Sequence, residues 1–173
     1  SEMRNPKILL PPSKRSRIVL SSLLSLYITI QLLVPMRYLF YDGKLFWNEQ
    51  GYRFSWRVML IEKAGYTQFY IHDQKGRKKL IDNSDYLSKQ QEKMMATQPD
   101  MILQYAHHLR NAYSDTLIIE GKEKINLKTP KVTADVYVSL FNKGSQPFID
   151  PNLNLSQIER GLHQKNWVLD YEK

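Results

Sequence analysis

Few residues of the types that carry chemistry stand at spacings that could bring them together. His107 and His108 are adjacent, so on a helix their side chains point about 100° apart and cannot chelate one ion together. Asp100, Gln104 and His108 do share a helical face, but a metal site there needs ligands from elsewhere in the chain. We expect this face to be a solvated or domain-packing polar stripe, and we predict no metal.

The other common chemical signatures are missing. The chain of 173 residues has no Cys, so it has no disulfide framework, no Cys-ligated zinc and no thiol nucleophile. It contains no phosphate-binding loop, no dinucleotide-binding glycine motif and no zinc-protease motif, and Ser55 lacks the context of a nucleophile elbow. The residues by themselves show no active site.

The net charge of +8 invites a nucleic-acid hypothesis, but its distribution argues against one. Half of the excess lies in residues 1–17, which carry five basic side chains and one acidic one. The cluster Lys75, Arg77, Lys78 and Lys79 lies on an expected turn without the interleaved aromatics that single-strand binding requires. We expect a solvated hairpin tip and no nucleic-acid partner.

The most apolar stretch follows this basic flank. Residues 18–36 contain no charged side chain, and a helix of that length covers close to the ~30 Å hydrocarbon core of a bilayer. Ser22, Ser25 and Thr29 recur at helical spacing, which is typical of packing on a neighbouring membrane helix. A membrane helix is the favoured interpretation. A buried helix of a soluble protein and a signal-peptide core are the alternatives, although no cleavage site follows Val34.

If this helix spans the membrane, its flanks predict the orientation. Lys14, Arg15 and Arg17 place the N-terminal flank in the cytoplasm by the positive-inside rule, so residues after about 41 are exoplasmic, that is, periplasmic or lumenal. Arg37, Tyr38 and Trp47 would fit an interfacial belt. The expected organisation is a basic flank (1–17), a transmembrane helix (18–40), an aromatic loop (41–56) and an exoplasmic α+β domain (57–173).

Hydrophobic patterns in the rest of the chain predict strands and helices. Strands are expected at 57–61 and 67–72 with a hairpin turn at 63–65, and at 78–81 after a turn at 74–77. Ser88 and Gln91 form a capping-box pattern that opens a short helix, and a second helix with a continuous apolar face starts near Pro99. A short strand at 116–119, a loop at 120–131 and a second hairpin over 131–149 complete the pattern. The predicted fold class is α+β: an N-terminal hydrophobic helix, then an antiparallel sheet with one or two covering helices.

Several segments together resemble the vitamin K-dependent gamma-glutamyl carboxylases and their bacterial relatives. The chain has a last membrane helix ending Ile30-Gln31-Leu32-Leu33-Val34-Pro35, followed by Gly51-Tyr52-Arg53-Phe54-Ser55-Trp56-Arg57-Val58-Met59-Leu60. In the family's order follow Gln98-Pro99-Asp100-Met101-Ile102, Ala134-Asp135-Val136-Tyr137-Val138, Phe148-Ile149-Asp150-Pro151 and Asn166-Trp167. The resemblance spans residues 24–170, with no match over 114–131.

The resemblance implies a chemistry and its cofactors. Such enzymes use O₂ to convert vitamin K hydroquinone to its epoxide, and the strong base so formed removes a γ-proton from a peptide Glu, which then adds CO₂. The family's lysine base lies in an upstream helical half, so no catalytic base is assigned to this chain. The implied partners are the membrane, that helical half of the same protein, and a Glu-containing peptide or protein.

The resemblance also implies a substrate-binding loop. Tyr52 and Trp56 match its aromatic positions, and Arg53 and Ser55 lie between them. Aromatic rings can wall an apolar quinone pocket and exclude water, while a hydroxyl or Arg orients a carboxylate. Alternatively, these aromatics anchor the loop on the domain. A non-enzymatic exoplasmic binding domain of a membrane scaffold is the competing hypothesis for the whole chain.

Overall fold

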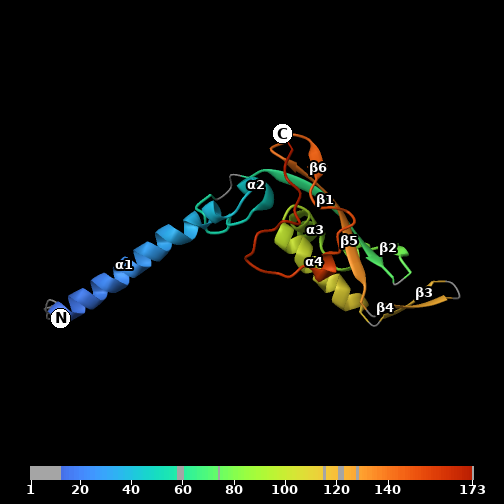
Figure 1. The fold of residues 1–173 in the computed structure, drawn as a ribbon, viewed down its shortest axis with the longest axis horizontal. Helices are drawn as coiled ribbons and strands as arrows, with labels where there is room; N and C mark the ends of the chain where they lie inside the picture. Colours follow the sequence, from blue (N-terminus) through green and yellow to red (C-terminus); the bar gives the residue numbers. More distant parts are fainter. Residues whose placement is uncertain are drawn as a thin grey trace, which may run out of the picture.

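The computed structural model describes residues 13–57, 61–73, 75–114, 116–120, 123–127 and 129–172. One long helix leads into a mixed domain of short helices and antiparallel strands (Figure 1). In chain order the elements are α1 (Lys14–Met36), η1 (Arg37–Phe40), α2 (Leu45–Asn48), β1 (Lys63–His72), β2 (Lys78–Leu80), η2 (Asn83–Asp85), α3 (Lys89–Met95), α4 (Pro99–Tyr113), β3 (Thr116–Glu120), β4 (Glu123–Leu127), β5 (Lys131–Leu140), β6 (Ser145–Pro147) and η3 (Leu155–Gln157).

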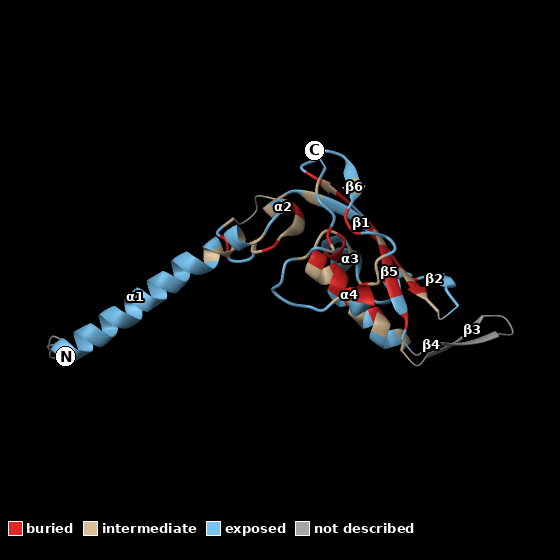
Figure 2. Cartoon of the chain, viewed as in Figure 1, coloured by how far each residue is buried: buried red, intermediate tan, exposed pale blue. Residues whose placement is uncertain are grey.

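Helix α1 stands away from the rest of the chain. Ser13 caps it by accepting a hydrogen bond from the backbone N–H of Ser16, and none of its residues is buried. Lys14–Phe40 reaches a mean hydropathy of 2.0, and by length and composition it is the one helix in the described part of the chain that could cross a membrane. The alternative of a buried core helix is wrong for this chain, because α1 leaves its Leu and Ile side chains exposed (Figure 2).

The domain is built on an antiparallel sheet with the strand order β2-β1-β5-β6. Its centre is the pairing of β1 with β5, in register from Lys63 opposite Leu140 to His72 opposite Lys131. Strands β3 and β4 form a separate two-stranded sheet. An N-terminal apolar helix followed by an antiparallel sheet and further helices confirms the α+β prediction.

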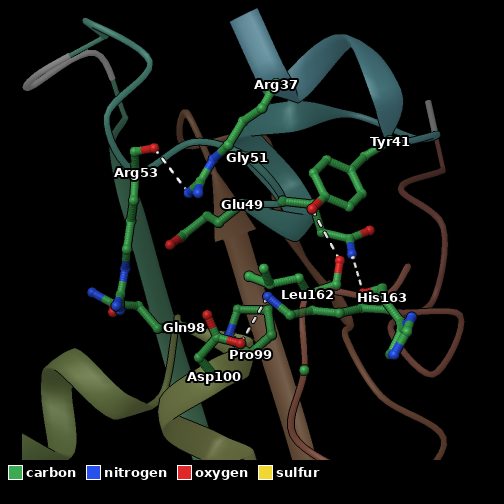
Figure 3. Close-up of a pocket in the computed structure, with 13 residues that line it drawn as sticks. Arg37, Tyr41, Glu49, Gly51, Arg53, Gln98, Pro99, Asp100, Leu162 and His163 are labelled. Carbon is green, nitrogen blue, oxygen red and sulfur yellow. Dashed lines mark hydrogen bonds and ion pairs between the residues drawn. The ribbon is translucent and has the colours of Figure 1, made fainter. Parts of the chain in front are cut away.

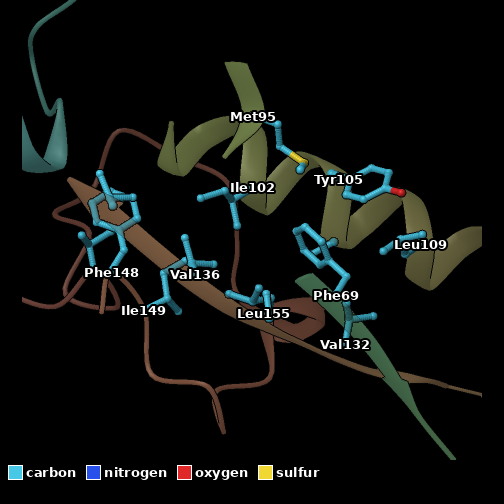
Figure 4. Packing of buried hydrophobic residues seen from close by; sticks show 14 of the residues in the cluster. Phe69, Met95, Ile102, Tyr105, Leu109, Val132, Val136, Phe148, Ile149 and Leu155 are labelled. Carbon is cyan, nitrogen blue, oxygen red and sulfur yellow. The ribbon is translucent and has the colours of Figure 1, made fainter. Parts of the chain in front are cut away.

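Helices α3 and α4 cover one face of the sheet. Because successive side chains on a strand alternate between faces, Phe69 and Ile71 of β1 and the alternate residues Val132 to Leu140 of β5 point to the helices and are buried. Ile102 and Leu109 of α4 pack onto this layer (Figure 4). The predicted alternation of β5, the capping box of α3 and the amphipathic face of α4 are thereby confirmed.

The hairpin turn expected at residues 63–65 is wrong. These residues belong to β1, which runs unbroken through its ten pairs with β5. Gly65 serves a close approach instead of a turn, because a Cβ there would lie 2.6 Å from the backbone oxygen of Ala96. Of the strand expected at 57–61, Arg57 and Ile61 are not in a strand, and residues 58–60 lie outside the described residues.

The loop expected over 120–131 is also wrong, because it contains β4, which pairs with β3 from Thr116 opposite Leu127 to Glu120 opposite Glu123. The strand forms through backbone hydrogen bonds to its partner, which the polar, Lys-rich composition does not reveal. The second predicted hairpin is present, with β5 and β6 joined through residues 141–144.

Candidate functional site

The segment between α1 and β1 holds the residues that the sequence singled out, and Trp47 anchors it. Trp47 is 2% exposed and packs edge-on against Phe148 and Tyr171, with ring centroids 4.8 and 5.0 Å away. Its indole N–H donates to the backbone oxygen of Leu169 at 2.7 Å. The expectation that Trp47 belongs to a membrane-interface belt is therefore wrong, since α2 inserts this ring into the core of the domain.

A buried ion pair fixes the same segment to the sheet. The amine of Lys63, at the start of β1, lies 2.8 Å from a carboxylate oxygen of Glu49, and its side chain is 4% exposed. It also donates to the backbone oxygens of Trp47 at 2.6 Å and Thr97 at 3.1 Å. Burial lowers the pKa of Lys63 below its ordinary value, and the nearby carboxylate of Glu49 opposes that shift.

The loop after Glu49 is folded tightly against η1. Gly51 has φ +70°, and a Cβ at this position would lie 2.6 Å from the Cα of Tyr38, so only glycine fits. The hydroxyl of Tyr52 donates to the backbone oxygen of Arg57, and its ring meets that of Phe46 edge-on. Ser55 is buried and donates to the backbone oxygen of Tyr52 at 2.6 Å. Tyr52 and Ser55 thus use their polar atoms to hold the loop's own shape.

Arg53, Phe54 and Trp56 point outward from this framework. Phe54 is 74% exposed and Trp56 is 71% exposed, and Arg53 is exposed as well. Phe54 and Trp56 both have positive φ, of 65° and 59°, which costs a non-glycine residue on the order of 1–3 kcal/mol. The loop is therefore strained in the conformation that exposes these rings, and such strain is typical of functional sites.

Two cavities border the loop. The smaller one, of about 60 Å³, lies between η1, the loop, the start of α4 and residues 161–165. Arg37 enters it and donates to the backbone oxygen of Arg53 at 3.0 Å, while Lys165 and Asp100 pair across it at 2.8 Å (Figure 3). The Nε of Arg37 is buried without a partner among the described residues.

The larger cavity, of about 320 Å³, lies on the other side of the loop against the last turns of α1. Leu32, Pro35, Met36 and Trp56 give it apolar walls, and its polar side chains include Gln31 and Ser55. It is open on one side, because no other described residue covers α1 at this level. The loop and α1 thus form one wall of an apolar site.

The remaining sequence candidates have local partners. His107 lies 2.8 Å from the backbone oxygen of Ile158, and His108 packs against the rings of Tyr86 and Tyr105. Asp150 accepts the backbone N–H of Asn152, as expected for a turn. Among the described residues, no group of three or more His, Asp or Glu side chains is placed to hold a metal ion.

Sequence reasoning missed the contacts that position the loop. Lys63 was assigned to a turn, and Glu49 was not singled out, because the two are far enough apart in sequence that only the fold joins them. The inward direction of Arg37 was missed for the same reason. The sequence carried one signal, because polar residues just before a glycine, here Glu49-Gln50-Gly51, often mark a turn. In the structure Glu49 takes a positive φ of 57°.

Comparison with family models supplies the decisive observation. The model described as vitamin K-dependent gamma-carboxylase, lumenal domain, matches residues 16–173, which is nearly the whole chain. The chain belongs to this family. Comparisons with curated proteins and with solved structures return no match. The gamma-carboxylase lumenal domain, together with the apolar helix α1, makes this a membrane protein with an exoplasmic domain.

Proposed function

We propose that this gamma-carboxylase lumenal domain binds a Glu-containing peptide at the exoplasmic surface and covers an active site formed with an upstream helical half of the same protein. In this proposal Arg53 orients the substrate carboxylate, Trp56 walls the apolar site, and Tyr52 and Ser55 hold the loop that carries them. The N-terminal flank of α1 is cytoplasmic, and the residues after about 41 are exoplasmic. No residue of this chain is the catalytic base.

The observation that supports this proposal is that some side chains of the loop hold its backbone while others are exposed. Tyr52 and Ser55 spend their hydrogen bonds on the loop backbone, whereas Trp56 lies exposed beside the apolar cavity at the end of α1 and Arg53 lies exposed at the smaller cavity on the other side of the loop. A guanidinium can bind a carboxylate through two parallel hydrogen bonds, and an indole excludes water from a reacting carbon. The positive φ of Phe54 and Trp56 is unfavourable by itself, so the hydrogen bonds of Tyr52 and Ser55 and the contact of Gly51 with η1 must hold the loop in this arrangement.

The chemistry of the larger cavity fits the cofactor that the family implies. Vitamin K hydroquinone, with O₂, would supply the strong base, and CO₂ would be the second substrate. An apolar ring system would contact Leu32, Pro35, Met36 and Trp56, and the amide of Gln31 provides polar atoms for its ring oxygens. The open side of the cavity faces where companion helices would pack on α1.

The proposal is tested in the full-length membrane protein, with its upstream helices. Trp56→Ala is expected to reduce hydroquinone oxidation by about tenfold or more, because it removes a wall of the site. Arg53→Gln is expected to raise the KM for a Glu peptide, and Arg53→Lys to restore only part of the loss. Met94→Ala, which alters an exposed apolar side chain on α3, is the control. Unchanged oxidation and peptide KM in the Trp56 and Arg53 variants would assign the loop to scaffolding.

The competing function is a non-enzymatic exoplasmic binding domain on a membrane scaffold. The enzyme and the scaffold hypotheses predict different helical halves beside this domain. A reading frame upstream of residue 1 that encodes the family's helices with their lysine supports the enzyme, and helices without that lysine support the scaffold.

A further inference from the structure

The face of the sheet that α3 and α4 leave open carries an ordered set of side chains. Directly opposite residues on antiparallel strands point to the same face, so the strand register arranges them in rows across β2, β1 and β5. The rows, beginning at the end of β1 farthest from α2, are Lys78–His72–Lys131, Leu80–Tyr70–Thr133, Gln68–Asp135 and Tyr66–Tyr137.

The first row is entirely basic. Lys78 and Lys131 stand on either side of His72, each directly opposite it on a neighbouring strand, so the two amines lie on the same face of the sheet. The amine of Lys78 lies 4.1 Å from the ring centroid of Tyr70, and no carboxylate in the described part of the chain forms an ion pair with Lys78 or Lys131. An anion bound across this row would meet both amines at once.

The opposite end of the same face is aromatic. Tyr66 and Tyr137 are paired across the strands and are 60% and 47% exposed. Between the two ends, Asp135 stands opposite Gln68, and partial burial together with this carboxylate raises the pKa of Tyr70. At about 3.3 Å per residue, six residues of β1 separate the aromatic row from the basic row, a distance of roughly 20 Å. That distance suits an extended segment of about six residues.

We infer that this open face, defined by Tyr66, Tyr70, His72, Lys78, Lys131 and Tyr137, docks an extended acidic polypeptide segment. Carboxylates of the segment meet the basic row, and an apolar or aromatic side chain further along packs on Tyr66 and Tyr137. This inference concerns a surface separate from the loop of the proposed function and does not depend on it.

Two observations favour a polypeptide over other anions. Asp135 interrupts the track at its middle, so a uniform polyanion such as a nucleic acid would meet a like charge there, whereas a segment that is acidic only at one end does not. Strand β2, which carries Lys78, lies on the side of the domain away from α1 (Figure 1), so the basic row lies far from the bilayer that α1 would span. A headgroup of that bilayer therefore does not reach it.

The chain itself, held in an uncharged detergent, allows a direct test. The probe is a fluorescein-labelled synthetic peptide with a block of Glu followed by two Phe, and its matched control has Gln in place of every Glu. Anisotropy is expected to show binding of the Glu peptide that weakens with added salt, and little binding of the Gln peptide. Equal binding of the two peptides would overturn the inference, and so would stronger binding of an oligothymidylate of similar length.

Variants on β2 and β5 distinguish binding at this face from a general attraction of the acidic peptide to a basic protein. Lys78→Glu together with Lys131→Glu is expected to weaken binding of the Glu peptide by about tenfold or more. Lys79→Glu is the control, because Lys79 follows Lys78 on β2 but points to the helical face, over the ring of Tyr113. An effect of Lys79→Glu as large as that of Lys78→Glu alone would refute the assignment.

A second readout does not depend on mutation. Partial burial, Lys131 and Lys78 lower the pKa of His72 below its ordinary value, while Asp73 opposes the shift, and the ring bonds Thr133 at 2.8 Å. A carboxylate bound on this row would favour the charged imidazole. Titration of His72 by NMR is therefore expected to show a higher pKa with the Glu peptide than with the Gln peptide, and an unmoved pKa would place the binding elsewhere.

Discussion

Replacing Lys63 with Met tests whether the buried ion pair holds the loop segment on the sheet. The Met side chain fills a similar volume but leaves the carboxylate of Glu49 and the backbone oxygens of Trp47 and Thr97 without the amine that they now bind. Breaking a buried pair from one side costs about 3–5 kcal/mol. Because the Glu49 side chain is 20% exposed and can take up water, we expect the lower end, a loss of about 3 kcal/mol in the free energy of unfolding.

The assay is denaturant unfolding of the chain in detergent, followed by fluorescence with Trp56 and Trp167 replaced by Phe, so that the signal comes from Trp47, whose ring lies in the core beside this pair. Glu49→Gln alone is expected to cost about 1–2 kcal/mol, since the amine keeps both backbone oxygens. The double variant should lose clearly less than the sum of the two, because the uncompensated carboxylate is gone. Lys143→Met, on an exposed turn, is the control and should change the free energy by less than about 0.5 kcal/mol.

The pH dependence of the free energy of unfolding is a second test, because the sign of the contribution of Lys63 can be predicted. Burial lowers the folded-state pKa of Lys63, so between that value and the ordinary 10.5 the unfolded chain binds a proton that the folded chain does not. Stability from this group therefore rises with pH across that window, and Lys63→Met removes the rise. A loss below about 0.5 kcal/mol in Lys63→Met, together with an additive double variant, would refute the reasoning.

Three further predictions concern single positions. Gly51→Ala should destabilise the domain by about 2 kcal/mol in thermal or denaturant unfolding, and more than Gly144→Ala, because both glycines have positive φ but only Gly51 has backbone within 4 Å of the new Cβ. Trp47→Ala should cost about 3–5 kcal/mol, and a loss under 1 kcal/mol would contradict its place in the core. Because the folded-state pKa of His72 is lowered below 6.5, the stability that it contributes is lost as pH falls below about 6.5. His72→Gln should therefore flatten the unfolding free energy between pH 6.5 and the folded-state pKa, and an unchanged slope would contradict it.

Local patterns were enough to predict the elements whose stability is mainly local. The pair Ser88 and Gln91 predicts the start of α3 because each satisfies a backbone or side-chain group of the other within one turn. The 3.6-residue spacing after Pro99 predicts α4 and its buried face, and the alternation over 131–141 predicts β5. The resemblance carried by the same segments predicted the family that the match over residues 16–173 shows.

The errors fall where pairing or packing with another element decides the local structure. Gly65 is a sequence signal for a turn, yet it lies inside β1 because the backbone of Ala96 needs the space of the missing Cβ. Residues 123–127 are too polar to indicate a strand by composition, and they become β4 through pairing with β3. For Gly65 the partner lies 31 residues away, outside any local window, whereas β3 is close to β4 in sequence but the polar composition of residues 123–127 does not indicate the pairing.

The sequence by itself determined an apolar helix, an aromatic loop and an α+β domain, because hydrophobic periodicity and capping act over a few neighbouring residues. Only the tertiary structure decided what each aromatic and each charge in the loop does. Trp47 and Trp56 are indistinguishable by type and lie nine positions apart, yet one is buried against Phe148 and the other is exposed beside α1. The physical reason is that burial and ion pairing depend on residues brought together by the β1–β5 sheet, and Lys63 meets Glu49 only once that sheet has formed.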